Sequence, residues 1–239
     1  TVSQKNILIL GGSSDIGAES IRLFLENNWK VTAHYNSKKI SPNIYKNYEK
    51  EFSQFKFDLK QISKFEKFLK KNEKKFNEFD AFVNLAGYLK PTTFEKFSTK
   101  NLYDHLNVNS ISGFLVIRTI VPGMKKRKWG RIVNTSSIGT KFGGAINNFA
   151  YSLSKFNNEF FPKYFKNFYS KNVIINSLQI GLTKTKMKKK IKKNFKERIK
   201  VIPLNRMASP KEVANYIFFL CCDKNTLLTG SVINISGGE

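Results

Sequence analysis

Short apolar runs alternate with longer amphipathic stretches along the whole chain of 239 residues. The apolar runs lie at 6–10, 31–35, 55–59, 81–87, 131–135, 172–176 and 231–235. Many of the stretches between them repeat apolar residues at intervals of three and four, the period of a helix with one buried face. Because parallel strands need crossover helices, the alternation predicts an α/β fold. We expect a doubly wound, mostly parallel seven-stranded sheet with helices on both faces.

The length fits one domain over residues 1–239, because a chain of this size can bury a sizeable core without dividing. Hydrophobic residues make up 41% of the chain and aromatic residues 14%, which excludes a disordered polyelectrolyte. We expect no membrane span and no secretory leader, since no apolar run approaches about 18 residues. Cys221 and Cys222 are adjacent and cannot form an ordinary bridge with each other, which fits a reducing, cytoplasmic location.

The formal net charge is +25, from 42 lysines and arginines against 17 acidic residues. One interpretation is binding to nucleic acid or to an anionic membrane. The other is a compositional bias toward lysine at surface positions, which fits the spread of lysines over most segments. We favour the second and expect neither partner, although a cationic surface attracts acidic substrates and proteins. The lysine-rich amphipathic stretch at 184–200 predicts a basic substrate lid over about 183–206.

The run at 6–10 leads directly into a glycine-rich turn at 11–17 and then into a helical pattern. Glycine lets the backbone approach a phosphate closely, and the start of a helix offers free N–H groups at the positive end of its dipole. A plain tight turn between a strand and a helix is the alternative. The order of strand, turn and helix favours a dinucleotide cofactor held in a Rossmann-like fold.

The end of the second strand indicates which dinucleotide is bound. A site for NAD usually has an acidic residue here to hold the ribose 2′-hydroxyl, whereas this chain has Asn36, Ser37 and Lys38, followed by Lys39. A cationic loop suits a 2′-phosphate, so we predict NADP(H). Lysines that merely decorate an exposed loop are the alternative, given the lysine excess.

Tyr151 and Lys155 lie four residues apart in a helical pattern and therefore on one helix face. If that face is buried, the ammonium stabilises the phenolate and lowers the tyrosine pKa toward a range useful for proton transfer. Such a pair is also common on solvated helices, so its significance depends on the rest of the sequence.

Taken together, these stretches resemble the short-chain dehydrogenase/reductase family over essentially the whole chain. The turn at 10–17 is similar to the family's glycine-rich turn and the run at 84–87 to its Asn-Asn-Ala-Gly motif. Tyr151 and Lys155 are similar to its Tyr-x-x-x-Lys pair. No single one of these motifs is specific for the family, but their order and spacing taken together are specific for it.

The resemblance implies four catalytic residues. Tyr151 would be the general acid that protonates a carbonyl oxygen, and Lys155 would tune Tyr151 and hold the nicotinamide ribose. Ser137 would donate a hydrogen bond to the substrate oxygen, with Ser136 as the alternative. Asn109 would anchor a water that connects Lys155 to solvent.

The resemblance also implies a set of cofactor contacts and no metal site. The turn residues would line the pyrophosphate, and the residues at the end of the second strand would contact the 2′-phosphate. Residues after the third and fourth strands would contact the adenine and the ribose, and residues after the sixth strand would contact the nicotinamide. These residues are Gly11, Gly12, Ser13, Ser14, Ile16, Gly17, Asn36, Ser37, Lys38, Asp58, Leu59, Asn84, Ala86, Gly87, Tyr151, Lys155, Thr183 and Thr185.

Several positions depart from the family pattern, beginning with Leu10 in place of the threonine that opens the glycine-rich turn. Asp15 replaces a glycine in the turn, and its carboxylate would repel a pyrophosphate unless it faces away. Ile180 stands where the family usually has proline, which would loosen the turn after the sixth strand. Pro162 lies inside the predicted catalytic helix, where we expect a kink that leaves the Tyr151–Lys155 pair intact.

The chain looks most like 3-oxoacyl-(acyl-carrier-protein) reductases, which implies NADPH-dependent reduction of a ketone to a secondary alcohol. In that group, basic residues before the fifth and sixth strands dock the acidic carrier, and here those places hold Arg127, Lys128 and Lys171. A reductase of keto-sugars or nucleotide sugars is the enzymatic alternative. A non-catalytic relative that regulates or binds nucleic acid is the alternative of another class. The resemblance also suggests a homotetramer or homodimer.

Overall fold

The computed structural model describes residues 4–186 and 195–239. Seven strands form one sheet in the order β3-β2-β1-β4-β5-β6-β7, and every neighbouring pair is parallel. The strands are β1 (Asn6–Leu10), β2 (Lys30–Tyr35), β3 (Phe52–Lys56), β4 (Ala81–Asn84), β5 (Gly130–Ser137), β6 (Val173–Ile180) and β7 (Val232–Ile235). The predicted seven-stranded, doubly wound sheet is confirmed.

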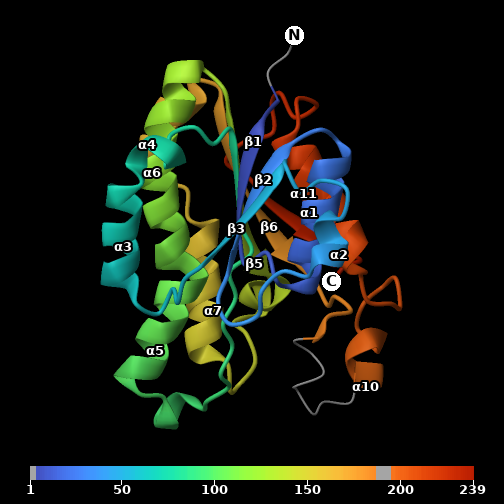
Figure 1. The fold of residues 1–239 in the computed structure, drawn as a ribbon. Helices are drawn as coiled ribbons and strands as arrows, with labels where there is room; N and C mark the ends of the chain where they lie inside the picture. The colour runs from blue at the N-terminus through green and yellow to red at the C-terminus, as the bar shows by residue number, and fades with distance from the viewer. Residues whose placement is uncertain (1–3, 187–194) are drawn as a thin grey trace.

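Helices cover both faces of the sheet (Figure 1). One layer holds α3 (Ile62–Lys71), α4 (Glu73–Phe76), α5 (Thr99–Leu106), α6 (Ser112–Arg127), α7 (Phe149–Phe156) and α8 (Lys166–Tyr169). The other side holds α1 (Asp15–Glu26), α2 (Pro42–Tyr45), α10 (Phe195–Lys200) and α11 (Pro210–Cys221). Short 3₁₀ turns are η1 (Phe94–Lys96), η3 (Ile138–Phe142), η4 (Asn157–Glu159) and η5 (Lys163–Phe165), and η2 (Asn107–Ile111) is a π-helical turn.

The alternation of side chains along β1 divides the core between the two layers. Leu8 and Leu10 belong to the apolar cluster under α3 and α6, whereas Ile7 and Ile9 belong to the cluster under α1 and α11. All four side chains are fully buried. A central parallel strand covered on both faces must be apolar at every position, which explains the unbroken run at 6–10.

The strand order reverses next to β1, because the chain proceeds to β2 on one side and later returns to β4 on the other. Helices that leave on opposite faces diverge there and open a crevice beyond the carboxyl ends of the strands. The topology therefore places the functional site at the ends of β1, β4, β5 and β6.

Several predicted elements have different bounds, and two of the differences have a clear cause. The third strand ends at Lys56 and not at 59, because its partner β2 ends at Tyr35, which is paired with Lys56. The apolar alternation continues through Phe57 and Leu59 only because these side chains pack into the core beyond the ladder. The helical pattern of apolar residues over 62–74 predicts one helix, but the structure divides it at Asn72, between α3 and α4.

The prediction of a kinked catalytic helix around Pro162 is wrong. Helix α7 ends at Phe156, continues as one 3₁₀ turn in η4, and becomes extended at Phe160. Proline disfavours the helical conformation of the residue before it, so the chain leaves the helix axis ahead of Pro162. Pro162 then precedes η5 as its N-cap residue.

The predicted lid is described only in part. Helix α10 covers its end, whereas residues 187–194, including Met187 and Ile191, lie outside the described residues. Within residues 4–186 and 195–239, no helix is both long enough and apolar enough to cross a membrane.

Candidate active site

A cavity of about 1130 Å³ opens at the carboxyl ends of the strands. This exceeds the roughly 300–1,000 Å³ of common ligand pockets, so there is room for a dinucleotide and a substrate together. Most of the predicted site residues line it: Gly11, Ser13, Ser14, Ile16, Asn36, Asp58, Leu59, Ala86, Gly87, Ser137, Tyr151, Lys155, Thr183 and Thr185. Gly12, Gly17, Ser37, Lys38, Asn84 and Asn109 are not part of the wall.

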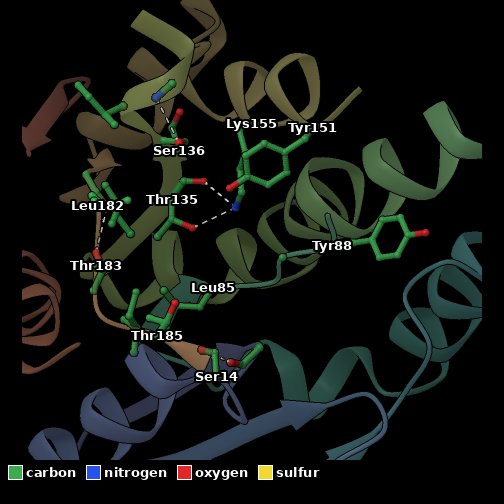
Figure 2. Close-up of a pocket in the computed structure, with 18 of the residues that line it drawn as sticks. Ser14, Leu85, Tyr88, Thr135, Ser136, Tyr151, Lys155, Leu182, Thr183 and Thr185 are labelled. Carbon is green, nitrogen blue, oxygen red and sulfur yellow. Dashed lines mark hydrogen bonds between the residues drawn. The ribbon is translucent and has the colours of Figure 1, made fainter. Parts of the chain in front are cut away.

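Helix α7 places Tyr151 and Lys155 side by side against the end of β5 (Figure 2). Lys155 is 5% exposed. Its Nζ donates to the backbone oxygen of Ala86 (3.2 Å) and to that of Thr135 (3.3 Å). Burial without an acidic partner disfavours the ammonium, which lowers the pKa of Lys155 to about 8.

The sequence-based expectation of a lowered Tyr151 pKa is wrong for this structure. Burial raises the pKa of Tyr151, and its hydrogen bond with the Ser137 side chain acts in the opposite direction with a smaller effect. The Lys155 ammonium is directed to backbone carbonyls, so desolvation of the phenol dominates. The phenol therefore keeps its proton at neutral pH and, in this structure, is a weaker acid than an ordinary tyrosine.

The two adjacent serines at the end of β5 have different environments. The Ser136 hydroxyl is buried and hydrogen-bonded to the carboxylate of Glu159. The Ser137 hydroxyl accepts from the backbone N–H of Gly139 (3.2 Å) and interacts with Tyr151. Of the two, Ser137 is therefore the hydroxyl adjacent to the phenol.

The turn between β1 and α1 suits a phosphate group. Gly11 has a positive φ of 75°, and a Cβ there would lie 2.5 Å from the backbone oxygen of Leu85. Ser14 caps the helix by accepting from the N–H of Gly17 (3.0 Å). The N–H groups of Asp15 and Ile16 lie too early in the helix to have an acceptor within it, and both residues line the cavity. Gly12 and Gly17 are buried behind this turn.

Asp15 does not present a free charge to the turn. Its Oδ2 accepts from the backbone N–H of Lys186 (2.6 Å), and its Oδ1 lies 3.7 Å from the Lys186 ammonium. The carboxylate is thus engaged by the segment after β6, and the Lys186 ammonium offsets part of its charge.

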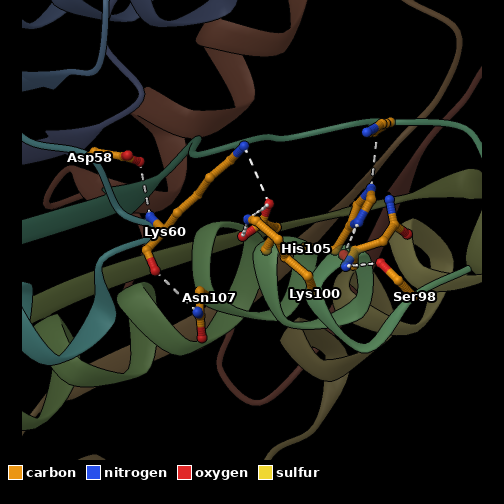
Figure 3. Close-up of polar contacts among 9 residues, drawn as sticks. Asp58, Lys60, Ser98, Lys100, His105 and Asn107 are labelled. Carbon is orange, nitrogen blue, oxygen red and sulfur yellow. Dashed lines mark hydrogen bonds and ion pairs between the residues drawn. The ribbon is translucent and has the colours of Figure 1, made fainter.

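The wall beyond β3 is built around Lys60 (Figure 3). Its backbone N–H donates to Oδ1 of Asp58 (3.1 Å), and its ammonium lies 3.4 Å from Oδ2 of Asp104 and 4.0 Å from the ring centre of Tyr88. Its backbone oxygen accepts from the Asn107 side chain (3.2 Å). These contacts join the loop after β3 to α5 and the π-helical turn, and so fix Asp58 and Leu59 in the wall.

Asn109 and Asn84 support the wall from behind. Oδ1 of Asn109 accepts from the N–H of Tyr88 (2.6 Å), and its Nδ2 donates to the backbone oxygen of Tyr88 (3.0 Å) and to the Ser154 hydroxyl (2.8 Å). The backbone oxygen of Asn84 accepts from the Thr135 hydroxyl (2.6 Å). Both side-chain amides are fully buried, and that of Asn109 fixes the loop after β4 against α7.

The turn after β6 is held by β7. The N–H of Gly181 donates to the backbone oxygen of Ile235 (3.2 Å), and a Cβ on Gly181 would lie 2.5 Å from Cα of Ser236. Thr183 is buried and donates to the backbone oxygen of Gly181 (3.0 Å). These contacts order the turn although Ile180 replaces the expected proline.

The structure adds residues that the motifs did not indicate. His34 lines the cavity beneath the phosphate turn, where its Nδ1 accepts from the N–H of Gly11 (3.2 Å). Thr135 lines it beside Lys155. Both lie near the carboxyl end of a parallel strand, and polar residues at these ends meet at one edge of the sheet. The sequence pattern therefore contained a signal for both residues. Residues in the described end of the lid, such as Arg198 and Val201, also line the cavity and had no comparable signal.

Comparisons with known proteins agree with this geometry. A family model described as enoyl-(acyl carrier protein) reductase matches residues 11–239. The 3-oxoacyl-(acyl-carrier-protein) reductase of Thermotoga maritima is 30% identical over 241 residues, or 98% of this chain and 97% of that protein. The acetoacetyl-CoA reductase of Shinella zoogloeoides is 30% identical over 237 residues, or 97% of each. The solved structure of ElxO with NADP bound has a TM-score of 0.85 at 26% identity, covering 99% of this chain and 98% of that one.

Proposed function

The chain belongs to the short-chain dehydrogenase/reductase family, and we propose that it reduces the ketone of a 3-oxoacyl group, carried on an acyl carrier protein, to a secondary alcohol. It is an NADP-dependent oxidoreductase of this family. The choice of substrate rests on the names of the two relatives, a carrier-protein reductase and a coenzyme A thioester reductase. The observation that carries the chemistry is the convergence of Tyr151, Lys155 and Ser137 on one cavity.

The cofactor is NADP(H), as in the solved relative with NADP bound. The cavity is large enough, and the Gly11 turn and the N-terminus of α1 fit a pyrophosphate. Asn36 lines the cavity at the end of β2, and Ser37 and Lys38 are exposed beside it. We assign this cationic loop to the 2′-phosphate. When bound, the cofactor supplies the hydride.

The chain's own residues supply the proton and hold the substrate. In this proposal the Tyr151 hydroxyl donates its proton to the ketone oxygen, and the Ser137 hydroxyl donates a hydrogen bond to the same oxygen. Lys155 places a positive charge beside the resulting tyrosinate. Because Lys155 has no acidic partner among its contacts, its charge is available to stabilise that anion.

Docking of the carrier at the basic residues before β5 and β6 stays a prediction. Arg127 is already engaged, with its Nε 3.0 Å from Oδ1 of Asp80. Lys128 and Lys171 are exposed, but they lie at the amino ends of β5 and β6, opposite the cavity. A strand of eight residues spans roughly 26 Å. These two lysines therefore do not support delivery of a carrier-bound substrate to the cavity of the same chain.

We also propose that the chain forms a homodimer or homotetramer in a reducing cytoplasm. Large apolar side chains are exposed on α7 and the segment that follows it, and on α11 and around β7. They include Phe156, Phe160, Tyr164, Tyr216, Phe219, Leu227 and Val232. Both cysteines are free thiols and buried. Light scattering of the wild type and of a Phe156→Glu, Phe160→Glu variant tests the assembly, and a wild type that is only monomeric contradicts it.

A substrate panel tests the function. Oxidation of NADPH is followed by absorbance with acetoacetyl-CoA, a 3-oxoacyl carrier protein and a keto-sugar nucleotide. We expect turnover of the acyl substrates, and a loss of more than about 1000-fold in kcat for Tyr151→Phe with NADPH affinity retained. Turnover of the keto-sugar alone moves the assignment to sugar substrates. No turnover of any carbonyl overturns it.

A further inference from the structure

A carboxylate lies behind the serine pair, outside the cavity wall. Glu159 ends the 3₁₀ turn η4, four residues after Lys155. It is half-buried and shares no ion pair with a basic residue in the part of the chain that the structure describes. The function proposed above does not use it.

One oxygen of this carboxylate collects contacts from three elements. Oε1 of Glu159 accepts from the Ser136 hydroxyl at the end of β5, lies 2.5 Å from the Thr140 hydroxyl in η3 and accepts from Nε2 of Gln179 in β6 (3.1 Å). Nε2 of Gln179 also donates to the Thr140 hydroxyl (3.0 Å). Glu159 therefore joins β5, β6 and η3 to the end of the catalytic helix.

The network reaches the proposed catalytic serine through Thr140. The Thr140 hydroxyl lies 2.6 Å from the backbone oxygen of Ser137, and the N–H of Gly139 donates to the Ser137 hydroxyl (3.2 Å). The turn from Ser137 to Thr140 is thus fixed at its start by these bonds and at its end by Glu159. Loss of the Glu159 carboxylate would therefore free the Thr140 side chain directly, and through it the turn that positions Ser137.

Glutamine is the closest replacement for Glu159. It has the same length and keeps an oxygen that can accept the hydrogen bonds of Ser136, Thr140 and Gln179. Alanine and aspartate remove that oxygen or withdraw it from the turn.

We propose that Glu159 is a positioning residue that holds the Ser137 hydroxyl in register with the Tyr151 hydroxyl by fixing the Ser137–Thr140 turn through Thr140. The proposal rests on the role of Ser137 in the proposed function. Since a misplacement of about 1 Å in a reacting group can reduce the rate about 100-fold, the effect belongs in kcat and not in cofactor binding.

The test compares Glu159→Ala, Glu159→Asp and Glu159→Gln with the wild type. We expect kcat to fall about 10–100-fold in the alanine and aspartate variants, with KM for NADPH and the melting temperature close to wild type. Glutamine should restore kcat to within about threefold. The matched control is Glu66→Ala, which removes an exposed carboxylate bonded to Arg118 (2.7 Å) far from this turn, and it should leave kcat unchanged.

A double variant separates positioning from general damage. If Glu159 acts through Thr140, then Thr140→Val lowers kcat to a similar degree, and Glu159→Ala combined with Thr140→Val is no worse than either change alone. Additive losses, or a kcat within twofold of wild type in Glu159→Ala, overturn the proposal. So does an equal loss of kcat and NADPH affinity, because that pattern marks a general structural role.

Crystal structures make the test independent of turnover. In Glu159→Ala the Ser137 hydroxyl should move away from the Tyr151 hydroxyl, and in Glu159→Gln it should stay in place. An unmoved Ser137 in Glu159→Ala overturns the proposal even if no carbonyl substrate is reduced. Conversely, a displaced Ser137 with no turnover in the wild type leaves Glu159 as a positioning residue and refutes only the proposed function.

Discussion

At the scale of single residues, Lys155 carries the charge that the proposed function requires, in a position that is unfavourable for a charge. Its ammonium is buried and its pKa is lowered to about 8, from 10.5 in an unfolded chain. The unfolded state therefore binds more protons between about pH 8 and 10.5, and folding stability rises with pH across that window. Below about pH 8 the whole cost of burying the protonated ammonium opposes folding. This cost is on the order of 3 kcal/mol before the two hydrogen bonds to backbone carbonyls are counted.

We therefore expect Lys155→Met to lose activity and to gain stability. Methionine removes the desolvated charge, while loss of the two hydrogen bonds offsets part of the gain, so the free energy of unfolding should rise by about 1–2 kcal/mol at pH 7. The gain should shrink at pH 9.5, where less of the charge penalty remains. Urea unfolding at both pH values measures it, and a methionine variant less stable than the wild type at pH 7 contradicts the argument.

Both histidines are held as neutral rings. Nε2 of His34 lies 2.8 Å from the backbone oxygen of Phe57, so it carries the proton and Nδ1 accepts from Gly11. In His105, Nδ1 lies 2.7 Å from the backbone oxygen of Asn101, and Nε2 accepts from the N–H of Lys90. Burial lowers the pKa of both side chains below 6.5. Protonation of either ring would place a second ring N–H against the backbone N–H from which that nitrogen now accepts, which is Gly11 for His34 and Lys90 for His105.

Stability should accordingly fall as the pH drops below about 6.5. In that window the unfolded chain binds protons at both histidines and the folded chain does not, which removes up to about 2.7 kcal/mol per pH unit. Urea unfolding between pH 7.5 and 5.5 measures the slope. His34→Gln and His105→Gln should each remove about half of the histidine contribution, and slopes equal to that of the wild type would refute the assignment.

The residues that sequence could and could not identify differ in what positions them. Ser137 ends β5 and Asp58 follows β3, so topology alone brings them to the cavity. Glu159 lies 23 residues from Ser136 along the chain, and the two meet only because α7 ends early. No periodicity encodes that end, because the helical pattern continues to Pro162. The raised Tyr151 pKa was also unpredictable, since it depends on how deeply the phenol is buried.

At the scale of elements, the packing of α6 against the segment after α4 depends on Gly123. Its N–H donates to Oδ1 of Asn77 (2.8 Å), and a Cβ there would lie 1.9 Å from the backbone oxygen of Asn77. That obstacle is backbone, which cannot rotate away, so a side chain would separate the two segments.

We expect Gly123→Ala to lower the free energy of unfolding by about 3 kcal/mol, because the added methyl group overpacks a buried contact. The matched control is Gly139→Ala, where the nearest atom to a Cβ is 3.5 Å away and the change in stability should be under about 1 kcal/mol. Chemical unfolding of both variants measures the difference. Equal stabilities would show that α6 shifts without cost.

Strand and helix types followed from apolar periodicity, whereas their ends depended on partners. β3 stops where β2 stops, although its side-chain pattern continues beyond that point. The capping box of Ser209 and Glu212 is the exception, because both of its hydrogen bonds are local to the start of α11. Bounds set by local chemistry were predictable, and those set by a neighbouring element were not.

At the scale of the whole molecule, the dominant feature is a net charge of +25 on a compact fold. Like charges on a folded surface repel, and unfolding moves them apart, so self-repulsion lowers stability at low ionic strength. The Debye length falls from about 30 Å at 0.01 M salt to about 3 Å at 1 M, which screens all but the nearest pairs.

The melting temperature should therefore rise by roughly 5 °C between 0.01 M and 0.5 M sodium chloride, a gain of about 2 kcal/mol for a chain of this length. Replacing exposed Lys163 and Lys166 by glutamate should raise the melting temperature in low salt and flatten its salt dependence. Millimolar sulfate, at matched ionic strength, separates screening from the binding of an anion at the phosphate turn, because only site binding saturates at low concentration. A melting temperature that does not change with salt would mean that the unfolded chain retains the same repulsion, and the charge would then affect association with partners rather than the stability of the fold.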